Sequence, residues 1–271
     1  MVNTSNFFKH KQAKWHYYQF GDGPEALIAM HGFGQNGKMF EPIALAFAEK
    51  YTIYAFDFIN HGKTEWNSEK PCTNEMWAEM LDEFAKEKSI QKFSLMGFSM
   101  GGKILLHSLP LVKTPVEFIF PMAMDGVKLS FYHKPYLKKA LPHYLVKKLI
   151  FNAAWSLKLL PILKKMNLVS EQAADFMHYY FENERRRMRS YMVWKSMLHF
   201  LFPLEEILEH IQNQQIKTHI FFGKNDKILS PKLAVQLHEM LPSSELHLVD
   251  GGHFIVNESL NPIFRHILAE Q

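Results

Sequence analysis

The sequence predicts an α/β fold in which a mostly parallel central sheet is flanked by helices. Short apolar runs alternate with helical patterns along most of the 271 residues, which is the pattern of strand–helix–strand units. The apolar runs at 26–30, 51–56 and 93–98 are nearly continuous, as expected of strands that are covered on both faces. Polar clusters follow directly after these runs, and sites in such sheets lie at the carboxyl ends of the strands.

The composition indicates an ordinary globular chain with a sizeable core. Hydrophobic residues make up 47% and charged residues 21% of the chain, and the length suits one large domain with an insertion. A net charge of +4 gives little support for a polyanionic partner, and no basic motif of a known nucleic-acid-binding module is present. We therefore expect no nucleic-acid partner, while the oligomeric state stays open.

Cysteine usage and hydropathy bear on the compartment. Cys72 is the only cysteine, which excludes an intramolecular disulfide and suits a reducing environment. The first ten residues lack the apolar run of a signal peptide, and no apolar stretch approaches the length of a membrane span. The expectation is a soluble cytoplasmic protein without a transmembrane segment.

In the first half of the chain, residues 14–20 have the aromatic content of an edge strand. The strand at 26–30 leads into the motif H-G-F-G and then into a helix over about 39–49, whose apolar residues share one face. The strand at 51–56 is followed by a polar loop, and Thr73 is predicted to cap a helix that runs to about Glu87.

In the second half, a strand at 116–124 ends at Asp125. The alternation then stops, and only helical patterns follow. It returns with a strand at 218–222, a helix at 231–240, a strand at 245–249 and a last helix at 255–269. The prediction is therefore a core formed by 1–126 and 206–271, interrupted by a helical insertion at 127–205.

The motif G-F-S-M-G at 97–101 stands where the strand at 93–98 turns into a helix. It fits the G-x-S-x-G form of a nucleophile elbow. Side chains at Gly97 and Gly101 would collide where the two backbones come close together. The turn lifts the Ser99 hydroxyl to the carboxyl end of the sheet and places its backbone at a helix N-terminus, where free N–H groups favour an oxyanion. Ser99 is therefore predicted to be a nucleophile.

Together, five segments resemble the α/β-hydrolase superfamily over nearly the full length of the chain: 31–34, 57–62, 97–102, 223–226 and 251–254. The resemblance implies an α/β-hydrolase fold with the insertion as a helical cap, and a catalytic triad in the order serine, acid, histidine. His253 is then the expected general base, and Asp226 the acid that orients it. Asp125, after the preceding strand, stays open as the alternative acid, and Asp250 is expected to point away from His253.

The resemblance also implies an oxyanion hole built from the backbone N–H groups of Phe33 and Met100. His31 is expected to fix the loop at 31–34 by hydrogen bonds, and Asp57 and His61 are expected to have structural roles. The residues expected to contact an apolar part of a substrate are Phe33, Phe98, Trp155, Phe176 and Tyr180.

The activity implied by the resemblance is hydrolysis of a carboxylic ester through an acyl-enzyme, without a metal or an organic cofactor. Because the elbow carries serine instead of aspartate, dehalogenase and epoxide-hydrolase chemistry is not expected. Thioesterase, carbon–carbon bond hydrolase and perhydrolase reactions stay open as alternatives, as does a non-catalytic binding protein on the same scaffold. The basic run R-R-R-M-R at 185–189 leaves peripheral contact with an anionic membrane open, while its plainer explanation is a solvated face of the cap.

Overall fold

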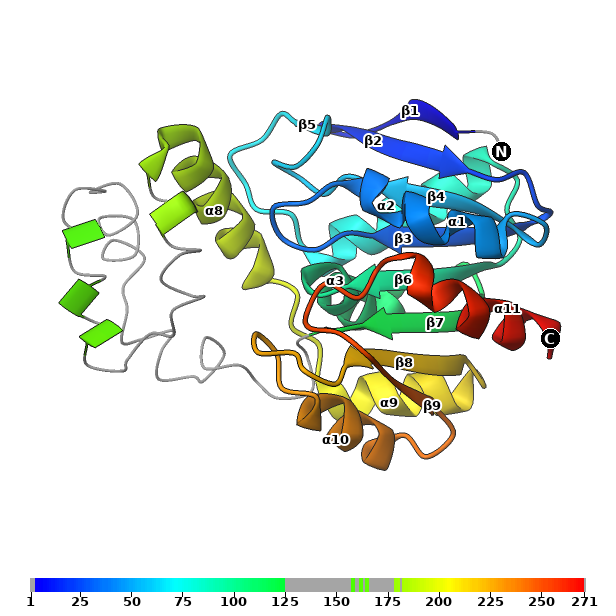
Figure 1. The fold of residues 1–271 in the computed structure, drawn as a ribbon. Helices are drawn as coiled ribbons and strands as arrows, with labels where there is room; N and C mark the ends of the chain where they lie inside the picture. Colours follow the sequence, from blue (N-terminus) through cyan, green and yellow to red (C-terminus); the bar gives the residue numbers. More distant parts are fainter. Residues whose placement is uncertain are drawn as a thin grey trace. The chain divides into compact units, whose positions relative to one another are not determined.

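The computed structural model describes residues 3–124 and 182–270, together with 157–158, 161–162, 164–165 and 178–180. The chain divides into two compact units, one formed by Met1–Lys128 with His199–Gln271 and the other by Leu129–Leu198. The first unit is the α/β core (Figure 1). It resumes seven residues earlier than the sequence predicts, at 199 instead of 206, and it includes helix α9 (Leu204–Asn213).

The described part of the core holds a nine-stranded sheet in the order β1-β2-β4-β3-β6-β7-β8-β9, with β5 paired to β2. The strands are β1 (Asn3–His10), β2 (Ala13–Phe20), β3 (Glu25–Met30), β4 (Tyr51–Phe56), β5 (Glu65–Trp66), β6 (Phe93–Phe98), β7 (Val116–Met122), β8 (Lys217–Gly223) and β9 (Glu245–Val249). From β4 to β9 all neighbours are parallel. Their carboxyl ends therefore meet at one edge of the sheet, and this arrangement confirms the predicted mostly parallel fold.

The prediction that residues 14–20 form an edge strand is wrong. Strand β2 lies inside the sheet, antiparallel to both β1 and β4, and β1 is the edge. The sequence of β1 is mostly polar and mostly exposed, so it lacks the apolar pattern by which strands are recognised. An edge strand needs little apolar surface because it gains its stability from pairing with one neighbour.

The helices of the core lie on both faces of the sheet (Figure 1). Besides α9, they are η1 (Gly37–Phe40), α1 (Glu41–Phe47), α2 (Asn74–Glu87), α3 (Met100–Ser108), η2 (Leu109–Leu111), α10 (Lys232–Met240), η4 (Glu258–Leu260) and α11 (Asn261–Ala269). The predicted cap at Thr73 is confirmed, because its side chain accepts a hydrogen bond from the Met76 backbone N–H. The last helix begins later than expected, since Asn257 caps a separate 3₁₀ turn before it.

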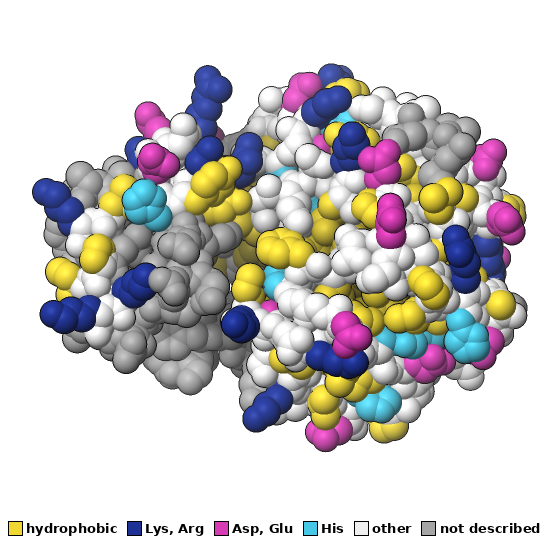
Figure 2. Space-filling model, in the orientation of Figure 1, with side chains coloured by type: hydrophobic (Ala, Val, Ile, Leu, Met, Phe, Trp, Pro, Cys, Tyr) yellow, Lys and Arg dark blue, Asp and Glu magenta, His cyan; other side chains and the backbone are white. Residues whose placement is uncertain are grey.

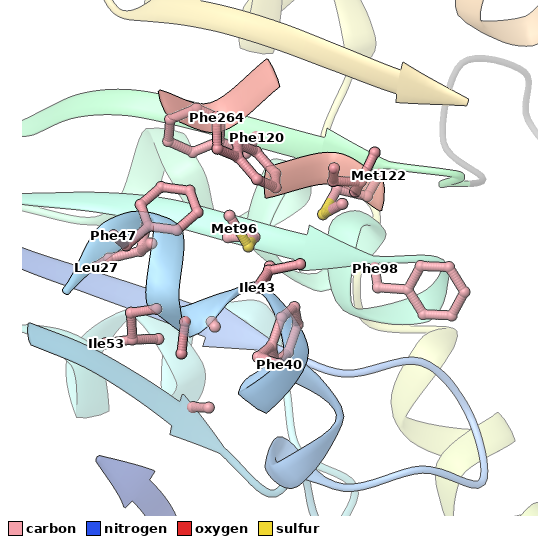
Figure 3. Close-up of a cluster of buried hydrophobic side chains, with 14 of the residues drawn as sticks. Leu27, Phe40, Ile43, Phe47, Ile53, Met96, Phe98, Phe120, Met122 and Phe264 are labelled. Atoms are coloured by element: carbon pink, nitrogen blue, oxygen red, sulfur yellow. The ribbon is translucent and has the colours of Figure 1, made fainter. Parts of the chain in front are cut away.

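The main core lies between the sheet and the pair of helices α1 and α11, which pack against each other. Figure 3 shows Phe40, Ile43 and Phe47 meeting strand side chains such as Leu27 and Met96 in this layer. Alternate residues of the same strands face the helices on the other side, as the pleat of a strand requires. Burial on both faces explains why these strands read as nearly continuous apolar runs.

In the second unit, the described residues include helix α8 (Glu184–Met197). Asn183 caps it by accepting a hydrogen bond from the Arg186 backbone N–H at 3.2 Å. The Arg186 guanidinium lies 3.7 Å from the centre of the Tyr179 ring, so part of the basic run is held by local contacts. Within the described residues, none of the helices combines the length and the apolar character needed to cross a membrane.

Candidate active site

Ser99 stands at the turn between β6 and α3 in a strained backbone conformation, with φ of 51° and ψ of −116°. Residues other than glycine rarely adopt a positive φ, and such strain persists only where the surrounding structure enforces it. Here the Ser99 N–H donates to the Met122 carbonyl at 2.8 Å, and the Ser99 carbonyl accepts from the Lys103 N–H at 3.2 Å. Anchors on both sides thus hold the Ser99 side chain at the carboxyl edge of the sheet.

The glycines that flank Ser99 allow this turn to pack closely. A Cβ atom at Gly101 would lie 2.0 Å from the Met30 carbonyl oxygen and 2.7 Å from that of His31. A Cβ atom at Gly97 would lie 2.5 Å from the Gly102 Cα. Both distances are far below van der Waals contact, so the first turn of α3 abuts the start of the loop at 31–34 only because position 101 has no side chain.

The structure brings Ser99, His253 and Asp226 into one hydrogen-bonded chain. His253 Nε2 lies 3.1 Å from Ser99 Oγ, and His253 Nδ1 lies 2.7 Å from Asp226 Oδ2. The other carboxylate oxygen of Asp226 accepts from the Ile228 and Leu229 backbone N–H groups at 2.8 and 2.9 Å. An ionised carboxylate only accepts, so His253 Nδ1 is the donor, and Nε2 is left to take the serine proton.

The structure bears differently on Asp125, the alternative acid, and on Asp250. Asp125 lies outside the described residues. Asp250 is exposed and pairs with Lys224 at 2.7 Å, which confirms that its side chain points away from His253. Among the described acids, Asp226 is the one whose carboxylate reaches the His253 ring.

Met100 and Phe33, the two expected oxyanion donors, lie on α3 and on the adjoining loop. Met100 is the first residue of α3, and the first N–H groups of a helix have no acceptor within the helix itself. The loop that carries Phe33 is tied to the chain after β4. His31 Nδ1 donates to the Gly32 carbonyl at 2.7 Å, and His31 Nε2 accepts from the Phe58 N–H at 3.0 Å. The expected role of His31 in fixing the loop is thereby confirmed.

His61 supports the same loop through a contact that the sequence alone does not predict. Its Nε2 accepts a hydrogen bond from the Gly34 N–H at 2.9 Å, and its ring packs edge-on against Phe33 with the centroids 5.5 Å apart. His61 itself is buried. The sequence does place His61 in the polar cluster after the strand at 51–56. In a parallel sheet this cluster lies beside the cluster at 31–34, which is the feature that could have indicated the contact.

The expected substrate contacts are only partly described. Trp155 and Phe176 lie outside the described residues, and Tyr180 lies in the second unit, nearly buried. Phe33 is half-buried. Phe98 is 1% exposed, and its ring lies 5.1 Å from that of His253, so Phe98 packs behind the imidazole and supports it.

Phe254 is an apolar residue at the site, in the segment 251–254, for which the sequence predicted no contact with a substrate. Its side chain is 67% exposed, although it follows His253 directly and its ring lies 5.5 Å from the imidazole. A single exposed apolar residue is ordinary on a protein surface, and it is the place beside the His253 ring that makes this one relevant to the site. Phe254 is therefore a candidate for contact with an apolar ligand group.

A second chain of serine, histidine and aspartate occurs in the described residues, in another setting. Ser5 Oγ lies 2.7 Å from His16 Nε2, and His16 Nδ1 lies 2.6 Å from Asp57 Oδ2. Ser5 belongs to the edge strand β1, whereas Ser99 sits at a strained turn before a helix. The pattern of hydrogen bonds alone therefore does not mark an active site, and the elbow distinguishes Ser99 from Ser5.

Comparison with known proteins agrees with this geometry. A family model described as the alpha/beta hydrolase fold matches residues 25–117. A Bacillus subtilis protein called uncharacterized hydrolase YugF is 25% identical over 268 residues, which cover 93% of this chain and 92% of the relative. A putative esterase/lipase of Haemophilus influenzae is 25% identical over 254 residues, with 89% and 81% covered.

Similarity to solved structures extends over nearly the whole chain. A putative lipase from Acinetobacter baumannii has a TM-score of 0.69 at 18% identity, covering 99% of this chain and 90% of that one. At such identity the likeness concerns the fold, while the family model covers the segment with the turn around Ser99. The chain therefore has the α/β-hydrolase fold, its residues 25–117 match the model of that family, and the relatives support a hydrolase of this type.

Proposed function

We propose that the protein is a serine hydrolase that cleaves carboxylic esters through an acyl-enzyme. The observation that carries the proposal is the hydrogen-bonded chain from Ser99 through His253 to Asp226 at a strained, glycine-flanked turn. A serine hydroxyl is a poor nucleophile until a base takes its proton, and that base works best when a third group orients it. All three parts stand within hydrogen-bond distance here.

In the first half of the reaction, the Ser99 proton moves to His253 Nε2 as Oγ forms a bond to the acyl carbon. The bond to the alcohol oxygen then breaks, and His253 returns the proton to that oxygen. In the second half, His253 takes a proton from water, whose oxygen attacks the acyl carbon, and Ser99 regains a proton as the acid leaves. Asp226 stays ionised throughout and stabilises the imidazolium.

The negative charge that develops on the acyl oxygen is assigned to the backbone N–H groups of Met100 and Phe33. Met100 begins α3, and Phe33 lies on the loop against which α3 packs; these positions support the assignment. Loss of one such donor costs about 3–4 kcal/mol of transition-state stabilisation in comparable enzymes.

We further propose that the ester has an apolar part. The exposed ring of Phe254 and the half-buried ring of Phe33 support this choice, as do the esterase/lipase relatives. The insertion at 127–205 is proposed as a cap that selects the substrate, on the ground of its sequence, which includes Trp155, Phe176 and Tyr180.

A fluorophosphonate probe tests the proposal, because it bonds covalently to an activated serine. Intact-mass analysis should show one adduct on the wild type and on Ser5→Ala, and none on Ser99→Ala. Turnover of p-nitrophenyl butyrate should fall by about 10⁶ in Ser99→Ala and stay near the wild-type value in Ser5→Ala. Labelling that persists in Ser99→Ala would refute the assignment, and an unlabelled wild type would favour a non-catalytic binding protein.

A second assay separates esters from the other acyl substrates. An ester, a thioester and a vinylogous 1,5-diketone with matched acyl chains are compared by kcat/KM, the last to test carbon–carbon bond cleavage. The proposal expects the ester to be the best substrate. A clear preference for either of the others would keep the serine mechanism and replace the substrate class.

A further inference from the structure

Three side chains that can bind a metal ion converge on one face of the strand pair β8–β9. His219 Nδ1 lies 3.4 Å from His247 Nε2 and 3.4 Å from Glu245 Oε2. The remaining distance, from His247 Nε2 to Glu245 Oε2, is 3.7 Å. The three ligand atoms thus form a nearly regular triangle.

The register of the two strands creates this triangle. In the parallel pair, His219 stands beside Glu245 and Phe221 stands beside His247. Positions 219 and 221 share one face of β8, and positions 245 and 247 share the same face of β9, because side chains alternate along a strand. The backbone therefore holds all three ligands on one surface before any ion binds.

Aromatic packing also holds the two imidazole rings. The His219 ring stacks on Phe120 with centroids 5.6 Å apart, and the His247 ring stacks on Phe221 with centroids 4.5 Å apart. The two imidazole centroids are 5.6 Å apart, whereas the nearest nitrogens are only 3.4 Å apart. The nearest nitrogens thus lie on the sides of the two rings that are turned toward each other, where one ion can contact both.

The size of the triangle fits a small tetrahedral ion. Zinc binds histidine nitrogen and carboxylate oxygen at about 2.0–2.2 Å, so two ligand atoms on a tetrahedron are roughly 3.4 Å apart. An octahedral magnesium site would need neighbouring ligands at roughly 2.9 Å and prefers oxygen donors. Two imidazoles and one carboxylate at 3.4, 3.4 and 3.7 Å match one face of a zinc tetrahedron.

We propose that His219, Glu245 and His247 form a binding site for Zn²⁺, with a water molecule as the fourth ligand. The Glu245 side chain is 59% exposed, which gives the ion and the water access from solvent. Figure 2 shows histidine and acidic side chains gathered on the surface next to β9 and α11. The site departs from the expectation that the protein has no metal.

The zinc site lies away from the proposed catalytic chain. Glu245 begins β9 and His219 lies near the start of β8, whereas Asp226 and His253 follow the carboxyl ends of these two strands. A shared ion would clamp β8 to β9 at their amino ends. Its predicted effect is therefore on stability, and ester hydrolysis by Ser99 does not depend on it.

The test uses the full chain without a histidine tag, because a tag would itself bind zinc. Protein stripped with a chelator is titrated with Zn²⁺ in competition with a chromogenic chelator, and with Co²⁺ to record the visible bands of a tetrahedral site. We expect one ion per chain, a tetrahedral cobalt spectrum, and a Tm that rises by several degrees when zinc exceeds its Kd about a hundredfold.

Glu245→Gln and His247→Gln are the diagnostic variants, and the first changes a side chain that is 59% exposed. Each removes a ligand, so zinc binding should weaken by more than the ten- to a hundredfold that the loss of an outer-shell partner costs. His10→Gln is the control, since this histidine lies on β1 at the opposite edge of the sheet from β9; it should bind zinc like the wild type. Wild-type binding no tighter than that of Glu245→Gln, or an equal loss in His10→Gln, would overturn the proposal.

Discussion

His61 Nε2 accepts a hydrogen bond from the Gly34 backbone N–H, with 2.9 Å between the two nitrogens. Its Nδ1 lies 3.0 Å from the Ile59 carbonyl oxygen and donates to it. Both ring nitrogens are thus used by the backbone, and the bond to Gly34 exists only while Nε2 carries no proton. Gly34 follows Phe33, so a buried, neutral imidazole positions the loop to which we assign one oxyanion donor.

His61→Ala should lower kcat by about ten- to a hundredfold with a smaller change in KM, because a misplaced oxyanion donor weakens transition-state binding more than substrate binding. Steady-state kinetics with p-nitrophenyl acetate measures this, at a temperature where circular dichroism shows the variant folded. The control is His266→Ala, an exposed histidine on α11, which should keep the wild-type kcat. Equal kcat in wild type and His61→Ala would show that the loop does not need this bond.

Asp226→Asn should reduce kcat by roughly 10⁴, because an amide at this position favours the wrong tautomer of His253. The Asp226 carboxylate is buried and held by two backbone N–H groups, so the substitution preserves the shape of the site. Single-turnover rates of acylation give the direct measurement.

Two other aspartates serve as comparisons for that change. Asp250→Asn removes an exposed partner of Lys224 and should leave the rate nearly unchanged. Asp125→Asn tests the alternative acid and is expected to cost far less than Asp226→Asn. If Asp125→Asn were nearly inactive and Asp226→Asn remained active, the triad acid would be Asp125.

Phe254→Ala should flatten the dependence of kcat/KM on acyl length. Each methylene that the wild type buries is worth about 0.8 kcal/mol, nearly fourfold in kcat/KM, so straight-chain p-nitrophenyl esters should improve until the apolar region is full. The variant should lose this gain for long chains and keep its rate on the acetate. Parallel losses for every chain length would indicate that Phe254 only supports His253.

Asp57→Asn should lower the free energy of unfolding at neutral pH by about 1.5–3 kcal/mol, the usual contribution of a hydrogen bond to a charged group. Asp57 is buried with His16 and accepts hydrogen bonds from the Gly37 and Lys63 backbone N–H groups. Burial alone would raise the pKa of Asp57, but the hydrogen bonds from His16 and the two N–H groups outweigh it and lower that pKa. Urea unfolding at pH 7 measures the loss.

The lowered pKa of Asp57 also predicts the direction of the pH dependence. A carboxyl whose folded pKa lies below its unfolded value of about 4 stabilises the protein above that value, and this contribution is lost as the pH falls through the folded pKa. The unfolding free energy of the wild type should therefore drop on acidification below about pH 4, and that of Asp57→Asn should drop less. Equal slopes for the two proteins would contradict the assignment.

The sequence alone determined the α/β class, the parallel direction of the central strands and the turn around Ser99. These features are local: a covered strand is apolar over its whole length, a capped helix begins at a residue such as Thr73, and a tight strand-to-helix turn needs glycine on both sides. The triad order of Ser99, Asp226 and His253 could also be predicted from the sequence, because each residue follows a strand and the carboxyl ends of these strands lie at the same edge of the sheet.

Tertiary structure alone decided which residues at those edges touch. The position of β1 at the edge, the bond from Gly34 to His61, and the two different settings of Ser5 and Ser99 all depend on strand pairing and loop packing between distant segments. The same holds for His219 and Glu245, which are 26 residues apart in the chain and neighbours only through the β8–β9 register. Hydrophobic periodicity specifies which face of a strand is buried, whereas register, which brings particular side chains together, is a property of the assembled sheet.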